Sequence, residues 1–274
     1  CMALKNDLLR IPIMVVTCMW LSNQAVAQDG GKAELAQELT NPIADLMTIP
    51  IQMNFDSDIG ANDEGNKITT NVQPVIPFEV SRDWNLITRT ILPIISQDEI
   101  SPGAGSQFGL GDITEQLFFS PKTFSGGVIW GVGGVFILPT ATESELGTRK
   151  WSLGPAGVAI SMRGPWTLGA LGNHAWSVAG DSDRADINNT FLQPFAAYTW
   201  SNAWTVSVQS ESNYNWENEK WSIPVNVAAS KLVFFGKLPV SLQAGIGYWL
   251  ESPDTGPEGI RYRLQANIVL PKPK

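Results

Sequence analysis

Hydrophobic and polar residues alternate along most of this chain, in short segments separated by Gly, Pro, Asp and Asn. In the last segment, RYRLQANIVL at 261–270, Tyr262 and Leu264 fall on one parity while Arg261 and Arg263 fall on the other. Successive side chains of a β-strand point to opposite faces, so this alternation predicts a strand with one apolar and one polar face. The apolar face would form the core of a soluble sandwich or the lipid-facing side of a membrane barrel.

Segments of this kind recur from residue 49 onward, and no helical periodicity persists there. Clear examples are IQMNFD, WTVSVQSESNYNW and PVSLQAGIGYWL. Single-chain bacterial outer-membrane barrels have an even number of strands. The runs in this chain predict twelve strands, which is an even number, at 49–57, 67–80, 84–96, 111–120, 127–139, 151–163, 166–179, 190–200, 204–216, 220–232, 239–250 and 259–270.

The connections between these segments alternate in length. Those after even-numbered strands are short, such as SRD at 81–83, whereas most of those after odd-numbered strands are longer and acidic, such as GDSDRADINN at 180–189. Short periplasmic turns and long external loops are typical of outer-membrane barrels. We therefore predict an all-β fold in which residues 49–274 form a closed antiparallel transmembrane β-barrel of twelve strands. A secreted soluble β-sandwich explains the alternation, but not the loop lengths or the tryptophans near strand ends.

The N-terminal part of the chain has a different character. Residues 1–27 combine Lys5 and Arg10 with an apolar run and end in an A-x-A sequence at 25–27, which is typical of a cleaved secretory signal peptide. The following residues, 28–48, are polar, with a short helical hint and an Asn-Pro pair. We predict that they form a short periplasmic segment, part helical and part irregular, that folds up against the barrel as a plug.

Composition narrows the classes of function. The chain is 43% hydrophobic but only 16% charged, below the roughly 25% of an average soluble domain. Both cysteines, Cys1 and Cys18, fall in the predicted signal peptide, so we expect no disulfide and no thiolate metal site in the mature chain. A lipoprotein cysteine at Cys18 fits less well, because Thr17 precedes it. The net charge of −8 argues against nucleic acid as a partner.

Two Gln-Pro pairs, Gln73-Pro74 and Gln193-Pro194, lie within predicted strands. Proline lacks the N–H that a strand donates to its neighbour, and it usually marks an edge or a bulge. In a closed barrel, which has no edge, we predict that both pairs form bulges or kinks. These either narrow the interior or, as the favoured alternative, are purely structural bends.

Several long blocks of the sequence resemble a known family. NPIADLMTIPIQMNFD, NVQPVIPFEVSRDWNLITRTILPI, GLGDITEQLFFSPK, WGVGGVFILPTAT and PVSLQAGIGYW closely resemble bacterial outer-membrane proteins of the MetA-pathway phenol degradation family. Its members are often labelled "transporter" or, by a misnomer, "neuromedin U". The similarity runs from about residue 41 to the C-terminus, where PKPK departs from the terminal aromatic residue common in such barrels. The resemblance implies an outer-membrane β-barrel connected with uptake of aromatic or other small apolar compounds.

Closure of the barrel would bring the last four strands beside the first one. An arginine that faces lipid near the bilayer midplane costs about 2–4 kcal/mol, which places both arginines of the last strand inside. A polar wall of this kind could wet a pore and orient solutes, or it could be a self-satisfied network that fills a narrow barrel. The candidate lumen-lining residues are Gln52, Asn54, Asp56, Gln209, Glu211, Asn213, Asn226, Gln243, Arg261, Arg263, Gln265 and Asn267.

The sequence offers no convincing catalytic group. His174, the single histidine, lies three residues from Ser177, so their side chains point to opposite faces of one strand and cannot form a nucleophile–base pair. A single histidine also argues against a transition-metal site. We therefore predict no catalytic or metal-binding residue and no cofactor, and we expect His174 to be lumenal or interfacial.

The resulting hypothesis is a barrel in the outer membrane of a Gram-negative bacterium that gives small solutes, including aromatic or apolar ones, passive passage. Acidic outer loops favour cations. The expected partners are outer-membrane lipid and lipopolysaccharide, a small-molecule solute and, during biogenesis, the barrel assembly machinery. The main alternative is a non-conducting structural or interaction barrel, and a lipid-acting barrel enzyme is less favoured.

Overall fold

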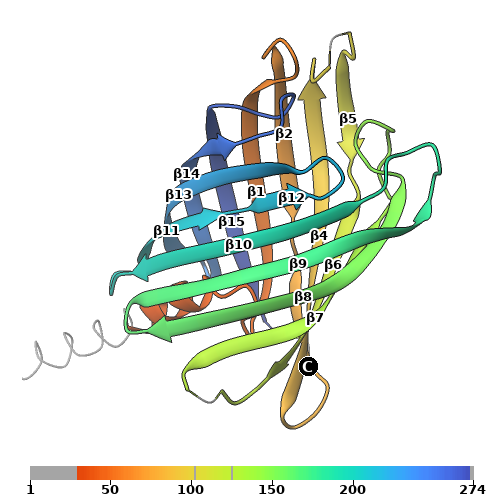
Figure 1. The fold of residues 1–274 in the computed structure, drawn as a ribbon. Coiled ribbons are helices and arrows are strands. Elements are labelled where there is room, and N and C mark those ends of the chain that lie inside the picture. The colour runs from red at the N-terminus through yellow and green to blue at the C-terminus, as the bar shows by residue number, and fades with distance from the viewer. Residues whose placement is uncertain (1–29, 102, 125, 272–274) are drawn as a thin grey trace, which may run out of the picture.

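A computed structural model describes residues 30–101, 103–124 and 126–271 (Figure 1). The predicted signal peptide lies outside the described residues. A helix occupies residues 30–38, and an irregular stretch leads from it to the first strand. Among the described residues, no helix is long and apolar enough to cross a membrane.

Fifteen strand segments form a single sheet. Three barrel strands are each divided into two segments that share a neighbouring strand. The first is β2 with β3, which both pair with β1 and with β4, and the second is β5 with β6, which both pair with β4. The third is β11 with β12, which both pair with β10 and with β13. The sheet thus has twelve barrel strands. The segments are β1 (Met47–Ile59), β2 (Gly65–Val72), β3 (Val75–Glu79), β4 (Trp84–Asp98), β5 (Ser106–Leu110), β6 (Ile113–Pro121), β7 (Val128–Leu138), β8 (Lys150–Arg163), β9 (Trp166–Gly180), β10 (Asn188–Thr199), β11 (Trp204–Ser210), β12 (Ser212–Asn215), β13 (Lys220–Phe235), β14 (Leu238–Glu251) and β15 (Ile260–Leu270).

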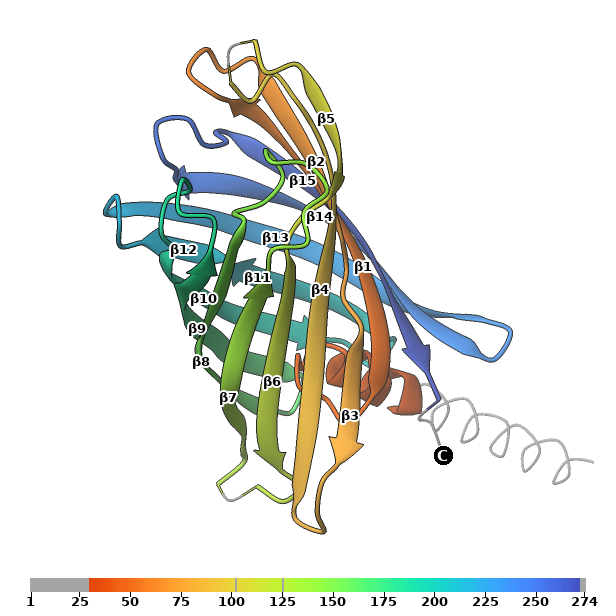
Figure 2. The same cartoon turned by 90° about the vertical axis from the view of Figure 1, so that its right-hand side faces the viewer.

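The sheet closes on itself through its first and last strands. The strands β1 and β15 pair antiparallel from Met47 opposite Leu270 to Phe55 opposite Tyr262, and Figure 2 shows them side by side. Every other barrel strand pairs antiparallel with its neighbours in the chain, including β9 with β10. Closure removes the free sheet edges that would otherwise expose unpaired backbone groups to lipid. The predicted closed barrel of twelve antiparallel strands is confirmed, and the soluble sandwich is excluded.

The two Gln-Pro pairs behave differently. Gln73-Pro74 separates β2 from β3, so the prediction of a kink there is right. It is wrong for Gln193-Pro194, because β10 runs through the pair, with Pro194 opposite Ala170 in a regular register. On its other side, β10 pairs with β11 and β12 at positions that leave out Gln193 and Pro194. The interruption therefore appears in the neighbouring strand, at Glu211 between β11 and β12.

The outer face is apolar and carries aromatic residues near both ends of the barrel. Near the short turns, Trp84 packs edge-on against Trp130 at 5.8 Å between ring centroids, and Trp166 packs against Tyr198 at 5.0 Å. Aromatic rings at these two levels are typical of barrels that sit in a bilayer, where they lie at the lipid headgroups. Exposed tryptophans near the long loops are Trp151, Trp176, Trp216 and Trp221.

The inner face has an apolar half and a polar half. Buried apolar side chains of β3, β4, β6, β8 and β9 form one cluster, against which Phe191 and Phe195 of β10 pack. The buried parity of β1 and β15, in contrast, consists largely of polar and charged residues. An interior that is partly apolar and partly polar is unusual for a purely aqueous pore, whose interior is polar throughout. The residues of the apolar cluster are Ile43, Val75, Ile87, Phe118, Ala156, Val158, Ile160 and Leu171.

Candidate functional site

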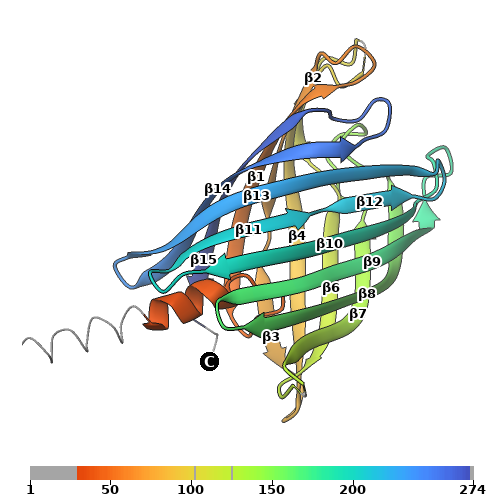
Figure 3. The same ribbon diagram turned by 60° about the vertical axis from the view of Figure 1, so that its left-hand side comes forward.

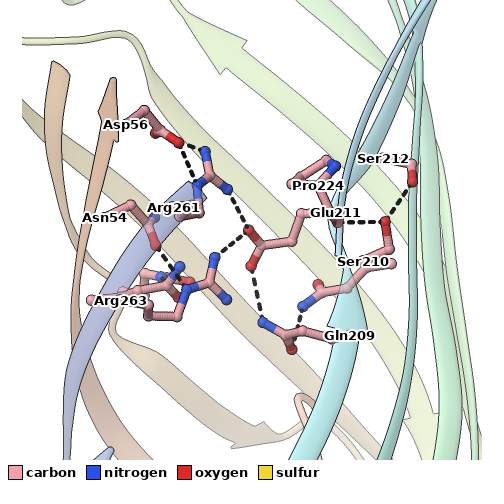
Figure 4. A network of polar contacts seen from close by, with 12 residues as sticks. Asn54, Asp56, Gln209, Ser210, Glu211, Ser212, Pro224, Arg261 and Arg263 are labelled. Atoms are coloured by element: carbon pink, nitrogen blue, oxygen red, sulfur yellow. Dashed lines mark hydrogen bonds and ion pairs between the residues drawn. The ribbon is translucent and has the colours of Figure 1, made fainter. Parts of the chain in front are cut away.

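The polar half of the inner wall is built around two arginines and two carboxylates that make three ion pairs (Figure 4). Arg261 donates from Nε to Asp56 Oδ1 at 2.7 Å and from Nη2 to Asp56 Oδ2 at 2.9 Å. Trp249 Nε1 donates to the same Oδ1 at 2.9 Å, and the guanidinium of Arg261 lies 4.5 Å from the centre of the Trp249 ring. Two-point binding of this kind fixes the orientation of both groups, so β1, β14 and β15 are held together on their inner side.

Glu211 connects this pair to the opposite part of the wall. Its Oε2 accepts from Arg263 Nη2 at 2.6 Å and lies 3.7 Å from Arg261 Nη1, while its Oε1 accepts from Gln209 Nε2 at 3.1 Å. Arg263 also donates from Nε to Asn54 Oδ1 at 2.7 Å. The break between β11 and β12 is thus the point from which one carboxylate meets both arginines of β15.

Two glycines of β14 leave space beside these arginines. Gly245 lies opposite Arg263 and Gly247 lies opposite Arg261 in the register of β14 and β15. A Cβ on Gly245 would come within 2.7 Å of Ala228 Cβ, and one on Gly247 would collide with the side chain of Asn226. The two glycines of the sequence AGIGYW, spaced two residues apart, therefore indicate a crowded inner face of a strand rather than a loop.

Gly247→Ala should destabilise the barrel, because the new methyl group would collide with Asn226 Oδ1 and must displace that buried amide. Overpacking of this type costs about 1–3 kcal/mol. The measurement is the urea concentration at the midpoint of unfolding in detergent, with tryptophan fluorescence as the signal. Gly157→Ala on β8 is the matched control, since its added Cβ would meet nothing closer than 3.9 Å. Equal midpoints for the two variants would contradict the proposed crowding.

A third arginine, Arg89 of β4, belongs to the same wall and was missed from the sequence. It donates from Nη2 to Gln73 Oε1 at 2.8 Å and from Nη1 to Gln116 Oε1 at 3.1 Å. Gln73 in turn donates to Gln52 Oε1 at 3.2 Å. The sequence did contain a signal for Arg89, since a lone charged residue in a membrane strand must face the barrel interior. Both faces of WNLITRTILPI mix apolar with polar residues, with Asn85 on the parity of Arg89 and with Thr88 and Thr90 on the other, and this hid the inward parity.

The structure brings most of the sequence-predicted site residues onto one stretch of wall. The contacts described above join six of them, namely Asn54, Asp56, Gln209, Glu211, Arg261 and Arg263. Gln52 belongs instead to the neighbouring group around Arg89, through Gln73. Asn226 is buried, and neither atom of its amide has a hydrogen-bond partner among the described residues. Asn213 is exposed and lies apart from the network, near the end of β12. The remaining three, Gln243, Gln265 and Asn267, line a cavity.

This cavity has a volume of about 160 Å³ and lies between the inner wall and the stretch 36–46. Its wall side is rich in amides and hydroxyls from β1, β10, β11, β13, β14 and β15, together with Gln73 and Arg89. Its apolar lining includes Val75 and Phe195. A volume near 150 Å³ is sufficient to hold a single benzene ring.

The N-terminal segment, residues 30–46, crosses the barrel at the end with the short turns (Figure 3). On one side, Gln37 Nε2 donates to Gly164 O at 2.8 Å, in the turn between β8 and β9. Ala36 packs with Ala203, in the turn between β10 and β11, and with Leu232 of β13, while on the opposite side Asp45 accepts from Asn85 Nδ2 of β4 at 3.4 Å. Ile43, between them in the chain, belongs to the apolar cluster of the inner face. Burial raises the pKa of the Glu38 carboxyl, an effect that a hydrogen bond to Asn41 partly offsets, so docking favours the neutral form of Glu38.

At the opposite end, the loop 139–149 is held over the inner side of β5. Asp112 accepts from the backbone N–H of Ala141 at 3.1 Å and from that of Thr148 at 2.7 Å. A Cβ on Gly109 would collide with Thr142 and lie 3.0 Å from Leu146, which is buried. The loop therefore packs inward against the wall.

The next long loop holds the loop 139–149 in place. Arg184, between β9 and β10, donates from Nη2 to Ser144 O at 2.9 Å and to Gly147 O at 2.6 Å. Both acceptors are backbone carbonyls of the inward loop. Arg184 thus joins two outer loops at the mouth.

His174 lies on the outer face of β9. Its Nδ1 is 2.7 Å from Thr190 Oγ1, and its ring packs against Trp176 at 4.2 Å between centroids. Ser177, on the opposite face, donates instead to Asp186 Oδ1 at 3.1 Å. The two residues are not brought together, and the described residues contain no cluster of His, Cys, Asp and Glu suited to a metal ion.

Solved structures with a similar fold are outer-membrane barrels. An outer-membrane channel of the COG4313 group from Pseudomonas putida F1 aligns with a TM-score of 0.59 and 16% identity, covering 82% of this chain and 96% of that chain. The protein folds as an outer-membrane β-barrel.

Other similar barrels give weaker alignments. The NanC porin aligns with a TM-score of 0.48 and 8% identity, and Escherichia coli outer membrane phospholipase A with 0.47 and 12%. These alignments cover 82% of this chain and 99% and 90% of the respective chains. Likenesses of this size carry no conclusion about activity. No protein-family model and no curated protein sequence matches the chain.

Proposed function

We propose that this barrel is an outer-membrane channel that gives small solutes passive passage. The observation that carries the proposal is the cavity of about 160 Å³ between the N-terminal segment and a wall of amides, hydroxyls and arginine. Such a wall replaces part of a solute's hydration shell, which is how pores select what they pass. The apolar cluster beside it offers a second surface, suited to the apolar part of a solute.

The N-terminal segment serves as the plug of this channel in our proposal. It contacts opposite sides of the barrel, since Ala36 packs with Ala203 and Leu232 near β11 and β13 while Asp45 accepts from Asn85 of β4, so it bridges the mouth at the end with the short turns. Passage then requires that solutes move around the segment or that it is displaced. Membership of the MetA-pathway phenol degradation family, and uptake of aromatic or apolar compounds, belong to this proposal because the resemblance in sequence supports them. Contacts with lipopolysaccharide and with the barrel assembly machinery are proposed on the same basis.

The charge of the wall sets the expected selectivity. Among the described residues, this part of the inner wall carries four cations, Arg89, Arg261, Arg263 and Lys67, which lies opposite Asp56 in the register of β1 and β2. Only two carboxylates of the described residues, Asp56 and Glu211, stand with them, which leaves an excess of two positive charges. The acidic outer loops attract cations, but interactions with exposed groups are screened by salt, while those in a narrow passage are not. We therefore expect a preference for anions, the reverse of the preference inferred from the loops.

Single-channel recording tests the proposed function. The refolded mature chain is inserted into a planar bilayer, and the reversal potential is measured under a gradient of KCl. Discrete conductance steps with a preference for chloride are expected. Folding is checked separately, by faster gel migration before boiling. A folded barrel that gives no conductance steps in repeated recordings would favour the structural alternative.

Arg184→Ala should widen the outer mouth, because the loop 139–149 loses two of the hydrogen bonds that hold it inward. We expect a conductance increase of about 1.5-fold or more, together with greater current noise, since surface loops that lose such bonds move more freely. Arg149→Ala is the control: it removes a largely exposed arginine from the same loop, whose ion pair with Asp181 at 3.6 Å is solvent-screened. Equal conductance in both variants would mean that the loop does not limit the current.

A further inference from the structure

The inner wall contains a part-buried cation, Arg89, that forms no direct ion pair among the described residues, and the carboxylate of Glu211 acts on it only at longer range. Both side-chain hydrogen bonds of Arg89 within the described residues go to neutral amide oxygens, on Gln73 and Gln116. The other two arginines of the wall each meet a carboxylate, Asp56 or Glu211. Charges taken out of water are normally paired, because an unpaired one loses its hydration without compensation. Arg89 is therefore the exception that requires an explanation.

The guanidinium of Arg89 is held in place by its surroundings. Gln73 accepts from Arg89 through its oxygen and donates to Gln52 through its nitrogen, so its amide is oriented from both sides. Gln73 itself is fixed at the break between β2 and β3, and its backbone N–H donates to Pro50 O at 2.8 Å. Arg89 lines the cavity of about 160 Å³, so its oriented guanidinium borders the space between the inner wall and the N-terminal segment.

The rest of the cavity has the chemistry of a site for a small organic molecule. Gln243 and Gln265, which face each other across β14 and β15, line it without a side-chain hydrogen bond to another described residue. Their amides can donate to oxygen atoms of a bound molecule. On the apolar side, the ring of Phe195 lies over Gly169, where an added Cβ would come within 2.6 Å of it. Phe195 and Val75 offer a surface for an apolar ring.

We propose that this cavity binds a small carboxylate with a single-ring apolar body, of the benzoate class. The carboxylate meets Arg89 and the cavity amides, and the ring packs against Phe195 and Val75. A carboxylate matches the planar fork of guanidinium donors, and the volume matches one ring. The proposal names the solute class of the channel proposed above and rests on the same cavity, but binding does not require that the barrel conducts.

Titration calorimetry on the refolded full-length mature chain in detergent tests this proposal. Benzoate is compared with benzamide, a neutral molecule of nearly the same shape, which also corrects for partition into the micelle. Benzoate should bind at least tenfold more tightly than benzamide and at least tenfold more tightly than acetate. Equal binding of benzoate and benzamide would overturn the role of the charge, and equal binding of benzoate and acetate would overturn the role of the ring.

Variants then assign the site. Arg89→Met should lower the benzoate affinity at least tenfold, and Arg89→Lys should retain an intermediate affinity, while both migrate as folded barrels on an unboiled gel. Arg82→Gln, in the exposed turn between β3 and β4, removes the same charge elsewhere and should leave affinity unchanged. Unchanged affinity in folded Arg89→Met would overturn the assignment. If Arg89→Met does not fold, the comparison of benzoate with benzamide on the unaltered protein still decides.

The experiments distinguish failure of the proposed channel from failure of the proposed binding site. Benzoate binding without conductance would remove the channel and keep the site, whereas conductance without a benzoate–benzamide difference would keep the channel and remove the site.

Discussion

Ile43→Asp should increase the single-channel conductance several-fold. Ile43 is 3% exposed and belongs to the apolar cluster that also contains Val75, Ile87 and Phe118. Full burial of an isoleucine side chain contributes about 1.5–3 kcal/mol, and a carboxylate in its place costs more than the contact supplied. The N-terminal segment then leaves the wall and opens the mouth that it crosses. The barrel strands keep their pairing, because Ile43 precedes β1.

The measurement is a conductance histogram from many insertions, with Glu34→Gln as the control. Glu34 lies in the same N-terminal segment, on its helix, but is exposed, so its substitution leaves the apolar contact intact. Protease treatment of folded protein adds a structural readout, since a released segment is cut while the barrel is not. A conductance equal to that of the unaltered chain, in a variant whose segment is cut, would show that the segment does not block the current.

Much of the fold follows from the sequence for a physical reason. A chain that crosses lipid must pair every backbone group, so alternating segments with short and long connections lead to a closed barrel. The same constraint placed Arg261 and Arg263 on the inside, where the structure joins them to Asp56, Glu211 and Asn54. Charged residues thus reveal the parity of a membrane strand.

The apolar half of the inner wall could not be recognised in this way. Ile87, Phe118 and Leu171 face inward, yet in sequence they look like residues that face lipid. The polar wall identified part of the site, while the apolar surface beside it depends on which strands lie opposite each other. Arg89 stands where these two surfaces meet, on a strand that has apolar residues on both faces.

The two Gln-Pro pairs show a second limit. The sequence placed a distortion at each proline, and at Gln193-Pro194 the distortion lies in the neighbouring strand instead. A missing donor interrupts the ladder between two strands, and the sequence does not say which of the two bends. In this barrel the interruption frees Glu211 to reach both arginines of β15.

Glu211→Gln should be the most destabilising single substitution in the polar wall. Glu211 accepts from Arg263 at 2.6 Å and lies 3.7 Å from Arg261, and the side chain of Arg263 is 1% exposed. Removing one partner of a buried ion pair leaves the other charge without compensation, at a cost of about 3–5 kcal/mol. Arg261 keeps Asp56, but Arg263 keeps only the neutral Asn54. The expected loss is therefore concentrated on Arg263.

A double variant separates the loss of the pair from the cost of the unpaired charge. Glu211→Gln combined with Arg263→Met should unfold at a higher urea concentration than Glu211→Gln alone, because no uncompensated charge remains buried. Glu217→Gln, in the exposed turn after β12, is the control and should change the midpoint little. If the double variant is instead less stable than Glu211→Gln by the full effect of Arg263→Met, the two residues act independently. The carboxylate would then not be what holds the arginine in the wall.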